Sequence, residues 1–190
     1  MRILMLGNSF TAANDLPQRL ARLTVAEVAA HTRGGARLAE QLNPKTKLGA
    51  RTKAALEGEP WDFVILQEMS HGPISSPQNF FNSVKRLCEW IRAKGATPVL
   101  FATWAYEKGG AKLADKSWDY EDMARQLFAA YRQAARENHA LLAEVGQRFY
   151  DLSPTYPLYA ADGVHPNEAG SQLAVEVLAE TILTHKELTP

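Results

Sequence analysis

The chain has 190 residues, 46% of them hydrophobic and 22% charged, a balance typical of a soluble globular protein with a single domain over residues 1–190. Its 21 basic residues balance 21 acidic ones, which argues against a nucleic-acid or membrane partner bound by overall charge, and its single cysteine, Cys88, excludes an internal disulfide and a cysteine metal cluster. No apolar stretch reaches membrane-spanning length and no leader peptide precedes the first predicted strand, so we expect a cytoplasmic protein.

The first element is a short apolar run, from Arg2 to Leu6, that stops at Gly7-Asn8-Ser9. A run of this kind predicts a strand covered on both faces, as in a parallel sheet flanked by helices. In an open α/β sheet, ligands bind just beyond the carboxyl ends of the strands, so Ser9 is expected to lie in that crevice. There it could act as a nucleophile if a base takes its proton, or it could simply cap the next helix.

Between residues 14 and 60 the pattern predicts helices and a second strand. Leu16-Pro17 begins a helix, because proline suits the first turn. Residues 24–31 fit either an extension of that helix or a strand. We favour the strand, because Gly34-Gly35 then falls at its carboxyl end, beside Ser9. Two short helices are expected at residues 38–42 and 47–56.

The second half of the chain continues the alternation. Strands are predicted at residues 61–67, 97–103 and 140–145, and helices at residues 76–94, 119–138 and from Pro166 to about Ile182. Residues 104–118 form a long loop, of a kind that often binds ligands, and residues 151–161 are irregular. Strands that alternate with helices predict an α/β fold in which about five parallel strands are covered by helices on both faces.

Asp162 and His165 stand three residues apart around a glycine, just before the last predicted helix. This spacing can set the carboxylate against one imidazole nitrogen while the other nitrogen faces the crevice. His165 would then accept the Ser9 proton, and Asp162 would fix the tautomer of the ring and stabilise its charged form. A metal site would need a third ligand, and none stands at a suitable spacing, so we expect no metal or other cofactor.

Ester hydrolysis also needs hydrogen-bond donors directed at the developing oxyanion. The candidates are the backbone N–H groups of Ser9 and of one glycine of the Gly34-Gly35 pair, and the side-chain amide of Gln67 at the end of a predicted strand. His71 in the next loop and Trp104 after the fourth strand are candidates for the walls of a substrate pocket.

Three blocks of the sequence resemble those of the SGNH, or GDSL-like, hydrolases: Gly7-Asn8-Ser9-Phe10-Thr11, Gly34-Gly35 and Asp162-Gly-Val-His165-Pro166-Asn167. The first block is similar to the branch whose nucleophile block is G-N-S-(F/Y)-T. The resemblance implies a flavodoxin-like, three-layer α/β/α sandwich with metal-free esterase activity, often as a carbohydrate deacetylase, lipase or thioesterase. It also implies that Ser9 is the nucleophile, that Asp162 and His165 complete the triad, and that a glycine of the pair, for which we favour Gly35, donates to the oxyanion.

The third block departs from the family pattern. The family usually has Gly-x-Asn-Asp after the third strand, with the asparagine as an oxyanion donor, whereas this chain has Leu66-Gln67-Glu68-Met69-Ser70. Gln67 is a candidate substitute, although a strict alignment places Met69 there, which has no side-chain donor. Arg37 also replaces the small hydroxyl residue that often follows the second-block glycine.

We interpret the chain as a serine esterase that hydrolyses a small acyl ester, such as an acetyl ester, of a carbohydrate or similar small-molecule alcohol through an acyl-enzyme. Two alternatives stay open at this stage. The Gly-Asn-Ser turn could bind phosphate in a flavodoxin-like module without catalysis. The chain could also be a degenerate hydrolase domain used for binding, because its third block is altered.

Overall fold

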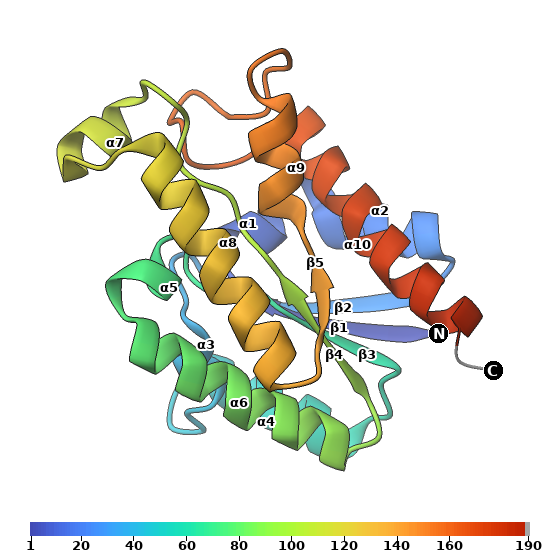
Figure 1. The fold of residues 1–190 in the computed structure, drawn as a ribbon. Helices are drawn as coiled ribbons and strands as arrows, with labels where there is room; N and C mark the ends of the chain where they lie inside the picture. Colours follow the sequence, from blue (N-terminus) through green and yellow to red (C-terminus); the bar gives the residue numbers. More distant parts are fainter. Residues whose placement is uncertain (189–190) are drawn as a thin grey trace.

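The computed structural model describes residues 1–188, which form one five-stranded sheet flanked by helices (Figure 1). The strands are β1 (Arg2–Gly7), β2 (Glu27–Thr32), β3 (Phe63–Leu66), β4 (Thr97–Phe101) and β5 (Leu141–Ala143). All neighbouring strands are parallel, in the order β2-β1-β3-β4-β5. This is the flavodoxin-like order of a doubly wound sheet, so the predicted fold class is confirmed.

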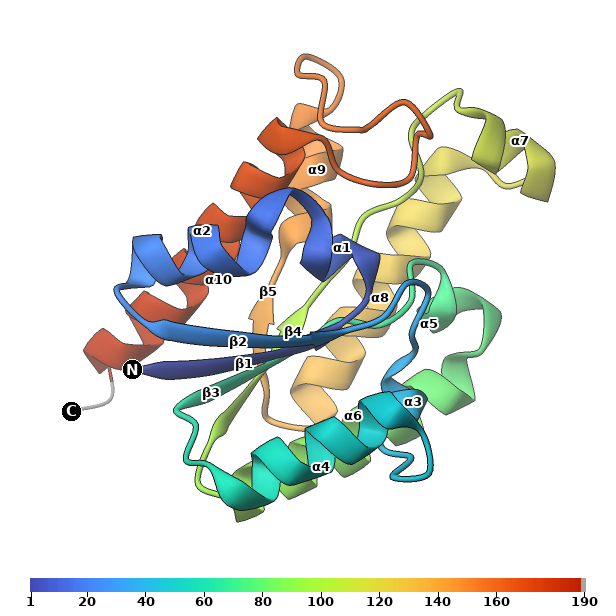
Figure 2. The same cartoon turned by 180° about the vertical axis from the view of Figure 1, so that it is seen from behind.

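Helices cover both faces of the sheet, which gives three layers (Figure 2). One face packs against α3 (Leu38–Gln41), α4 (Lys47–Gly58), α6 (Pro77–Ala93) and α8 (Tyr120–Glu137). The other face packs against α1 (Ser9–Ala12), α2 (Leu16–Thr24), α9 (Val145–Leu152) and α10 (Glu168–Leu188). No helix within residues 1–188 is both long and apolar enough to cross a membrane.

The central strand β1 shows why its sequence is apolar without interruption. Leu4 and Leu6 point into the core beneath α4 and α6, whereas Ile3 and Met5 point into the core beneath α2 and α10. All four side chains are fully buried, because successive residues of a strand face opposite sides and both sides are covered by helices. β2 lies at the sheet edge and is only partly buried, which explains why its sequence fitted both a strand and a helix.

The structure adds short helices that the sequence pattern did not predict. They are α1, a 3-10 turn η1 (Ala13–Asp15), α5 (Gly72–Ser75), α7 (Ala111–Lys116) and α9. The predicted 104–118 loop therefore contains a helix, and the strand predicted over 140–145 ends at Ala143. α9 begins at Val145, soon after β5, and packs closely on the segment that follows β4: a Cβ on Gly146 would lie 2.1 Å from the carbonyl oxygen of Thr103.

Candidate active site

Ser9 lies at the carboxyl end of β1, as the first residue of α1 (Figure 2). The side-chain oxygen of Asn8 accepts a hydrogen bond from the Phe10 N–H at 3.1 Å and so caps the helix. The amide nitrogen of Asn8 donates to the carbonyl of Ala36 at 3.1 Å. Asn8 therefore fixes the Ser9 turn to the loop that contains Gly34 and Gly35.

The side chain of Gln67 holds the same turn by hydrogen bonds from within the core. Its side-chain oxygen accepts the Asn8 N–H at 3.0 Å and the hydroxyl of Thr11 at 2.9 Å, and its amide nitrogen donates to the backbone carbonyl of Glu68. Gln67 is only 1% exposed. This placement corrects the prediction that the Gln67 amide donates to the oxyanion, because the amide is buried and engaged within the protein.

The structure brings Ser9, His165 and Asp162 into one chain of hydrogen bonds. Ser9 Oγ lies 2.8 Å from His165 Nε2, and His165 Nδ1 lies 2.5 Å from Asp162 Oδ2. The second carboxylate oxygen of Asp162 accepts the backbone N–H groups of Val164 and His165 at 3.0 and 2.9 Å. A serine, an imidazole and a carboxylate in this order can activate the hydroxyl as a nucleophile.

The charge of Asp162 is fixed by its local hydrogen bonds. Partial burial would raise the pKa of this carboxyl, but the hydrogen bonds from the His165 ring and from the Val164 and His165 N–H groups outweigh it and lower the pKa to about 2. Asp162 is therefore ionised at neutral pH, next to the ring nitrogen that it orients.

Contacts from the β4 end hold the loop that carries Asp162 and His165. Gly163 has a φ of +64°, and its carbonyl accepts the Glu107 N–H at 2.8 Å. The indole nitrogen of Trp104 donates to the carbonyl of Val164 at 3.0 Å. The loop is thereby fixed at the two residues that lie between Asp162 and His165.

Trp104 is the centre of an aromatic column beneath the site. Its ring stacks on Phe149 at 4.0 Å and on Phe10 at 4.6 Å, and Phe10 in turn makes a T-shaped contact with the His165 ring at 5.4 Å. Trp104 is completely buried. The prediction that it lines a substrate pocket is therefore corrected, and its contacts make it a support of the His165 loop.

Gly34 and Gly35 lie in an exposed turn beside Ser9. The register of β1 and β2 pairs Gly7 with Thr32, so the two strands end side by side. Gly35 has a φ of +67°, a conformation that favours glycine. Within residues 1–188, no acceptor is found for the backbone N–H groups of Ser9, Gly34 or Gly35. Both glycines remain candidates for oxyanion donors.

Glu68 is a buried carboxylate that sequence reasoning did not single out. It is 1% exposed, and its two oxygens accept the backbone N–H groups of Leu38 at 3.1 Å and of Met69 at 2.8 Å. It joins the loop after β2 to the loop after β3. The available signal was a charged residue two positions after the end of the apolar β3 strand.

His71 is half-buried in the loop after β3. Its Nδ1 lies 2.8 Å from the hydroxyl of Tyr106, and its ring meets Trp118 edge-on at 5.4 Å. Burial lowers the pKa of His71, and the nearby charges of Lys116, Arg37 and Lys112 lower it further, so the neutral ring is favoured. An anchored, partly exposed ring of this kind remains a candidate for the wall of a substrate pocket.

No cluster of three or more histidine, cysteine, aspartate or glutamate side chains that could hold a metal ion occurs within residues 1–188. Ser9, His165 and Asp162 are joined by hydrogen bonds at the carboxyl edge of a flavodoxin-like sheet, an arrangement that can activate a serine hydroxyl for attack on an ester.

The chain belongs to the GDSL-like lipase/acylhydrolase family, whose sequence profile matches residues 5–173. The predicted membership of the SGNH hydrolases is thus confirmed. No curated protein sequence matches the chain.

Solved structures agree with this assignment. A protein from Slackia heliotrinireducens assigned to the SGNH hydrolases is 55% identical, with a TM-score of 0.93 over 96% of this chain and 98% of that one. A protein of unknown-function family DUF4886 from Bacteroides uniformis is 18% identical, with a TM-score of 0.75 over 97% of this chain and 83% of that one. An acetylxylan esterase from Geobacillus stearothermophilus, 15% identical, has a TM-score of 0.67 over 95% of this chain and 93% of that one. The last two similarities concern the fold alone.

Proposed function

We propose that this chain is a serine esterase that removes a small acyl group, with acetyl as the first candidate, from a carbohydrate or similar alcohol. One observation carries the proposal: a continuous chain of hydrogen bonds links Ser9 Oγ through the His165 ring to the Asp162 carboxylate. The residues come from opposite ends of the sequence, so their contact depends on the whole sheet.

The proposed reaction begins with attack of Ser9 Oγ on the ester carbonyl carbon while His165 Nε2 takes the hydroxyl proton. The tetrahedral adduct collapses, the alcohol leaves with the proton from His165, and the acyl group stays on Ser9. A water molecule then loses a proton to His165 and attacks the acyl-enzyme, which releases the acid and returns the proton to Ser9. Asp162 stabilises the charged ring in both steps.

The oxyanion needs donors that are already in place, since the loss of one typically lowers the rate by ~10²–10³-fold. The unpartnered N–H groups of Ser9 and of Gly34 or Gly35 are suited to this role, and we favour Gly35. With Gln67 buried beneath the turn, two backbone donors replace the side-chain donor of the usual third block.

The choice of an acetylated carbohydrate is supported by the shared fold of the acetylxylan esterase. A phosphate-binding module would explain the Gly-Asn-Ser turn, but it would leave the contacts of Ser9 with His165 and of His165 with Asp162 without a purpose. The esterase explains both contacts.

The test is a panel of 4-nitrophenyl esters of increasing acyl length, together with labelling by a fluorophosphonate. We expect turnover of the acetyl ester and one added phosphonyl group on Ser9, seen by intact mass, with both lost in Ser9→Ala. The absence of turnover and of labelling in folded protein would refute the proposal.

A further inference from the structure

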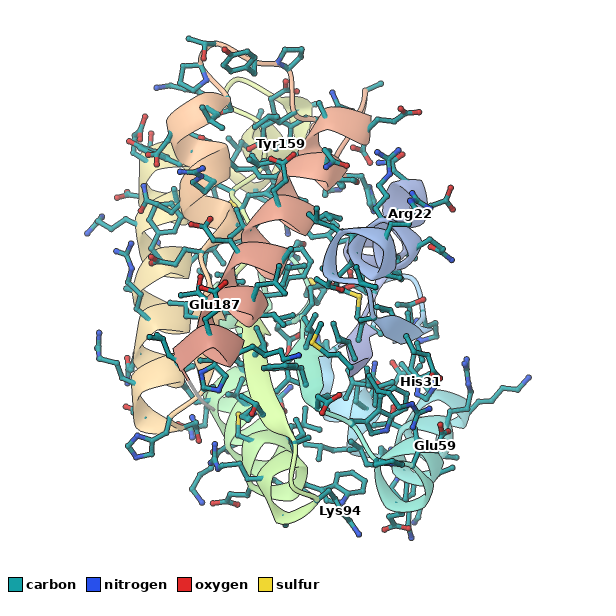
Figure 3. All side chains as sticks on the ribbon, turned by 90° about the vertical axis from the view of Figure 1, so that its right-hand side faces the viewer. Arg22, His31, Glu59, Lys94, Tyr159 and Glu187 are labelled. Carbon is teal, nitrogen blue, oxygen red and sulfur yellow. The ribbon has the colours of Figure 1, made fainter. Side chains whose placement is uncertain are left out.

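A concave site lies beside the loop that carries Asp162 and His165. It is a pocket of about 300 Å³ between α8, α9 and the segment that follows α9. Tyr159, one of its lining residues, lies at the opposite end of the molecule from Lys94, which precedes β4 (Figure 3). The pocket is therefore at the same end of the sheet as the carboxyl ends of the strands.

Aromatic rings and hydroxyl groups dominate the wall of this pocket. The residues that carry them are Tyr120, Tyr150, Ser153, Tyr156 and Tyr159. The hydroxyls of Tyr120 and Ser153 lie 3.2 Å apart, and the hydroxyl of Tyr159 donates to the carbonyl of Ala105 at 2.9 Å. Pro154, Pro157 and Leu158 add apolar surface.

The charges around the pocket disfavour an anionic ligand, because its lining holds two glutamates and one lysine. Lys108 pairs with Glu121 at 2.8 Å and also lies 5.6 Å from the centre of the Tyr120 ring. The hydroxyl of Tyr150 donates to the other oxygen of Glu121. The carboxylate of Glu107 has no hydrogen bond or ion pair within residues 1–188, so it adds an uncompensated negative charge and a free acceptor.

The pocket is joined directly to the candidate active site. The backbone N–H of Glu107 donates to the carbonyl of Gly163, and the Glu107 side chain lies against the same glycine: a Cβ there would be 3.2 Å from Glu107 Oε2. Tyr159 forms a backbone bridge with Pro166, the residue after His165. Two walls of the pocket thus hold the loop that carries Asp162 and His165.

We infer that this pocket is a saccharide subsite, which binds a neutral sugar unit of an acylated oligosaccharide while another unit presents its ester to Ser9. A sugar ring matches the wall, because its C–H faces suit tyrosine and proline and its hydroxyls can donate to Glu107 and exchange hydrogen bonds with Ser153 and the tyrosines. The part of this inference that concerns turnover rests on the proposed esterase function; the binding of the sugar does not.

The binding test uses the full chain with Ser9→Ala, so that no ester is consumed. Xylotriose, cellotriose and chitotriose are titrated by calorimetry, and we expect saturable binding of at least one with a Kd of about 1 mM or below. Adding Tyr156→Ala or Glu107→Gln should weaken it about tenfold, the expected effect of one aromatic or hydrogen-bonded contact. Tyr156 is 60% exposed, so its removal should not affect folding.

Leu183→Ala is the matched control, because Leu183 is also a partly exposed side chain, on α10 and outside the pocket. Its Kd should equal that of the parent. The inference fails if no trisaccharide binds at about 10 mM. Tetramethylammonium is titrated as well, because an aromatic pocket beside carboxylates could instead bind an organic cation; its binding without any saccharide binding would also refute the inference. It also fails if the control weakens binding as much as Tyr156→Ala.

The turnover test separates this inference from the proposed function. In the chain that keeps Ser9, we compare kcat/KM for acetylated xylotriose with kcat/KM for 4-nitrophenyl acetate. Tyr156→Ala should lower the ratio of the two about tenfold. An equal fall for both substrates would overturn the subsite, whereas no turnover of 4-nitrophenyl acetate by the unsubstituted chain would refute the esterase and leave the binding result standing.

Discussion

Asp162 keeps its charge through local hydrogen bonds, although half of its side chain is exposed to solvent. Two of its three partners are backbone N–H groups of the same turn, so the position of the carboxylate does not depend on the His165 ring alone. This arrangement separates two tasks of the residue. One oxygen shapes the loop, and the other orients the imidazole.

Asp162→Asn should lower kcat by ~10²–10⁴-fold, because an amide can favour the wrong tautomer of His165 and cannot stabilise its charged form. Turnover of 4-nitrophenyl acetate measures this loss. The control is Asp122→Asn, because Asp122 is an exposed aspartate paired with Arg125. A loss of less than tenfold would show that the carboxylate does not support the base.

The same substitution should also change how the free energy of unfolding depends on pH in acid. The folded chain lowers the pKa of Asp162 from 3.8 to about 2, so the ionised carboxylate stabilises the fold above pH 3.8 and this contribution is lost as the pH falls towards 2. The free energy of unfolding of the unsubstituted chain should therefore converge with that of Asp162→Asn over this window. The gap will be small, because solvent screens a half-exposed group.

Trp104→Phe tests the support beneath His165. Phenylalanine keeps the stack with Phe10 and Phe149 but removes the N–H that donates to the carbonyl of Val164. We expect a loss of about 1 kcal/mol in the free energy of unfolding, because a partly buried carbonyl loses its partner. We also expect kcat to fall about tenfold, with KM little changed.

Chemical denaturation and ester kinetics measure both effects, and Trp90→Phe on α6 is the control, since Trp90 packs on the opposite face of the sheet. Equal losses of kcat in the two variants would show that the indole N–H does not position the His165 loop.

Residue identity alone did not separate crevice-facing side chains from buried supports. Gln67 and Trp104 both follow strands at the edge where ligands bind, which made them candidates for the site. In the structure each turns inward, Gln67 to the Asn8 N–H and Trp104 to the Val164 carbonyl. The direction depends on which backbone groups remain unpaired near each side chain, and these are set by distant parts of the chain.

At the scale of elements, the segment after β3 connects the other two loops of the site. The Gln67 side chain reaches the Ser9 turn, and the Glu68 side chain reaches Leu38, after the Gly34-Gly35 turn. Adjacent residues of an extended chain point in opposite directions, so one dipeptide can hold both loops.

Glu68→Gln keeps the shape of the side chain but brings an amide donor against one of two backbone N–H donors. We expect kcat/KM to fall about tenfold or more, because the Gly34-Gly35 loop loses an anchor. Glu89→Gln, an exposed glutamate paired with Lys85, is the control and should leave kcat/KM unchanged.

The pH dependence of stability gives an independent test of Glu68. Burial raises its pKa above the ordinary 4.5, and the hydrogen bonds from Met69 and Leu38 and the charge of Arg37 offset this only in part. The folded chain thus holds the Glu68 proton more tightly than the unfolded chain, so the contribution of Glu68 to stability falls as the pH rises above about 4.5. As the pH rises above about 4.5, the free energy of unfolding of the unsubstituted chain should decrease relative to that of Glu68→Gln. Urea unfolding measures both values, and a difference that does not change with pH would contradict the raised pKa of Glu68.

Long elements were predictable from the sequence and short ones were not. α6 and α8 each place apolar residues on one face over several turns, and β3 is a compact apolar run, so their positions agree with the prediction. α1 and α5 have four residues each, too few for a helical period to show in the sequence. The missed α9 begins where a strand pattern still continued.

At the scale of the whole molecule, the sheet order is what assembles the site. Ser9 follows β1 in the centre of the sheet, and His165 precedes α10, which packs across the face where α1 and α2 also lie. These residues are 156 positions apart, and no local pattern links them. Their pairing could be expected from the order of the family blocks, whereas the contacts of Asn8, Glu68 and Trp104 that fix it required the three-dimensional structure.

The packing of α10 on the sheet should therefore affect the free energy of unfolding more than it affects kcat. Leu178 is fully buried in the core beneath this helix, and its truncation in Leu178→Ala should cost about 2–5 kcal/mol in the free energy of unfolding through lost burial and a residual cavity. Leu183→Ala, on the same helix but 37% exposed, should cost less than about 1 kcal/mol.

Because neither side chain touches Ser9 or His165, kcat per folded molecule should stay unchanged at temperatures where both variants are folded. Urea unfolding and active-site titration with the fluorophosphonate measure the two quantities separately. A loss of kcat in folded Leu178→Ala would mean that the register of α10 on the sheet, and not only the loop before it, sets the contact between His165 and Ser9.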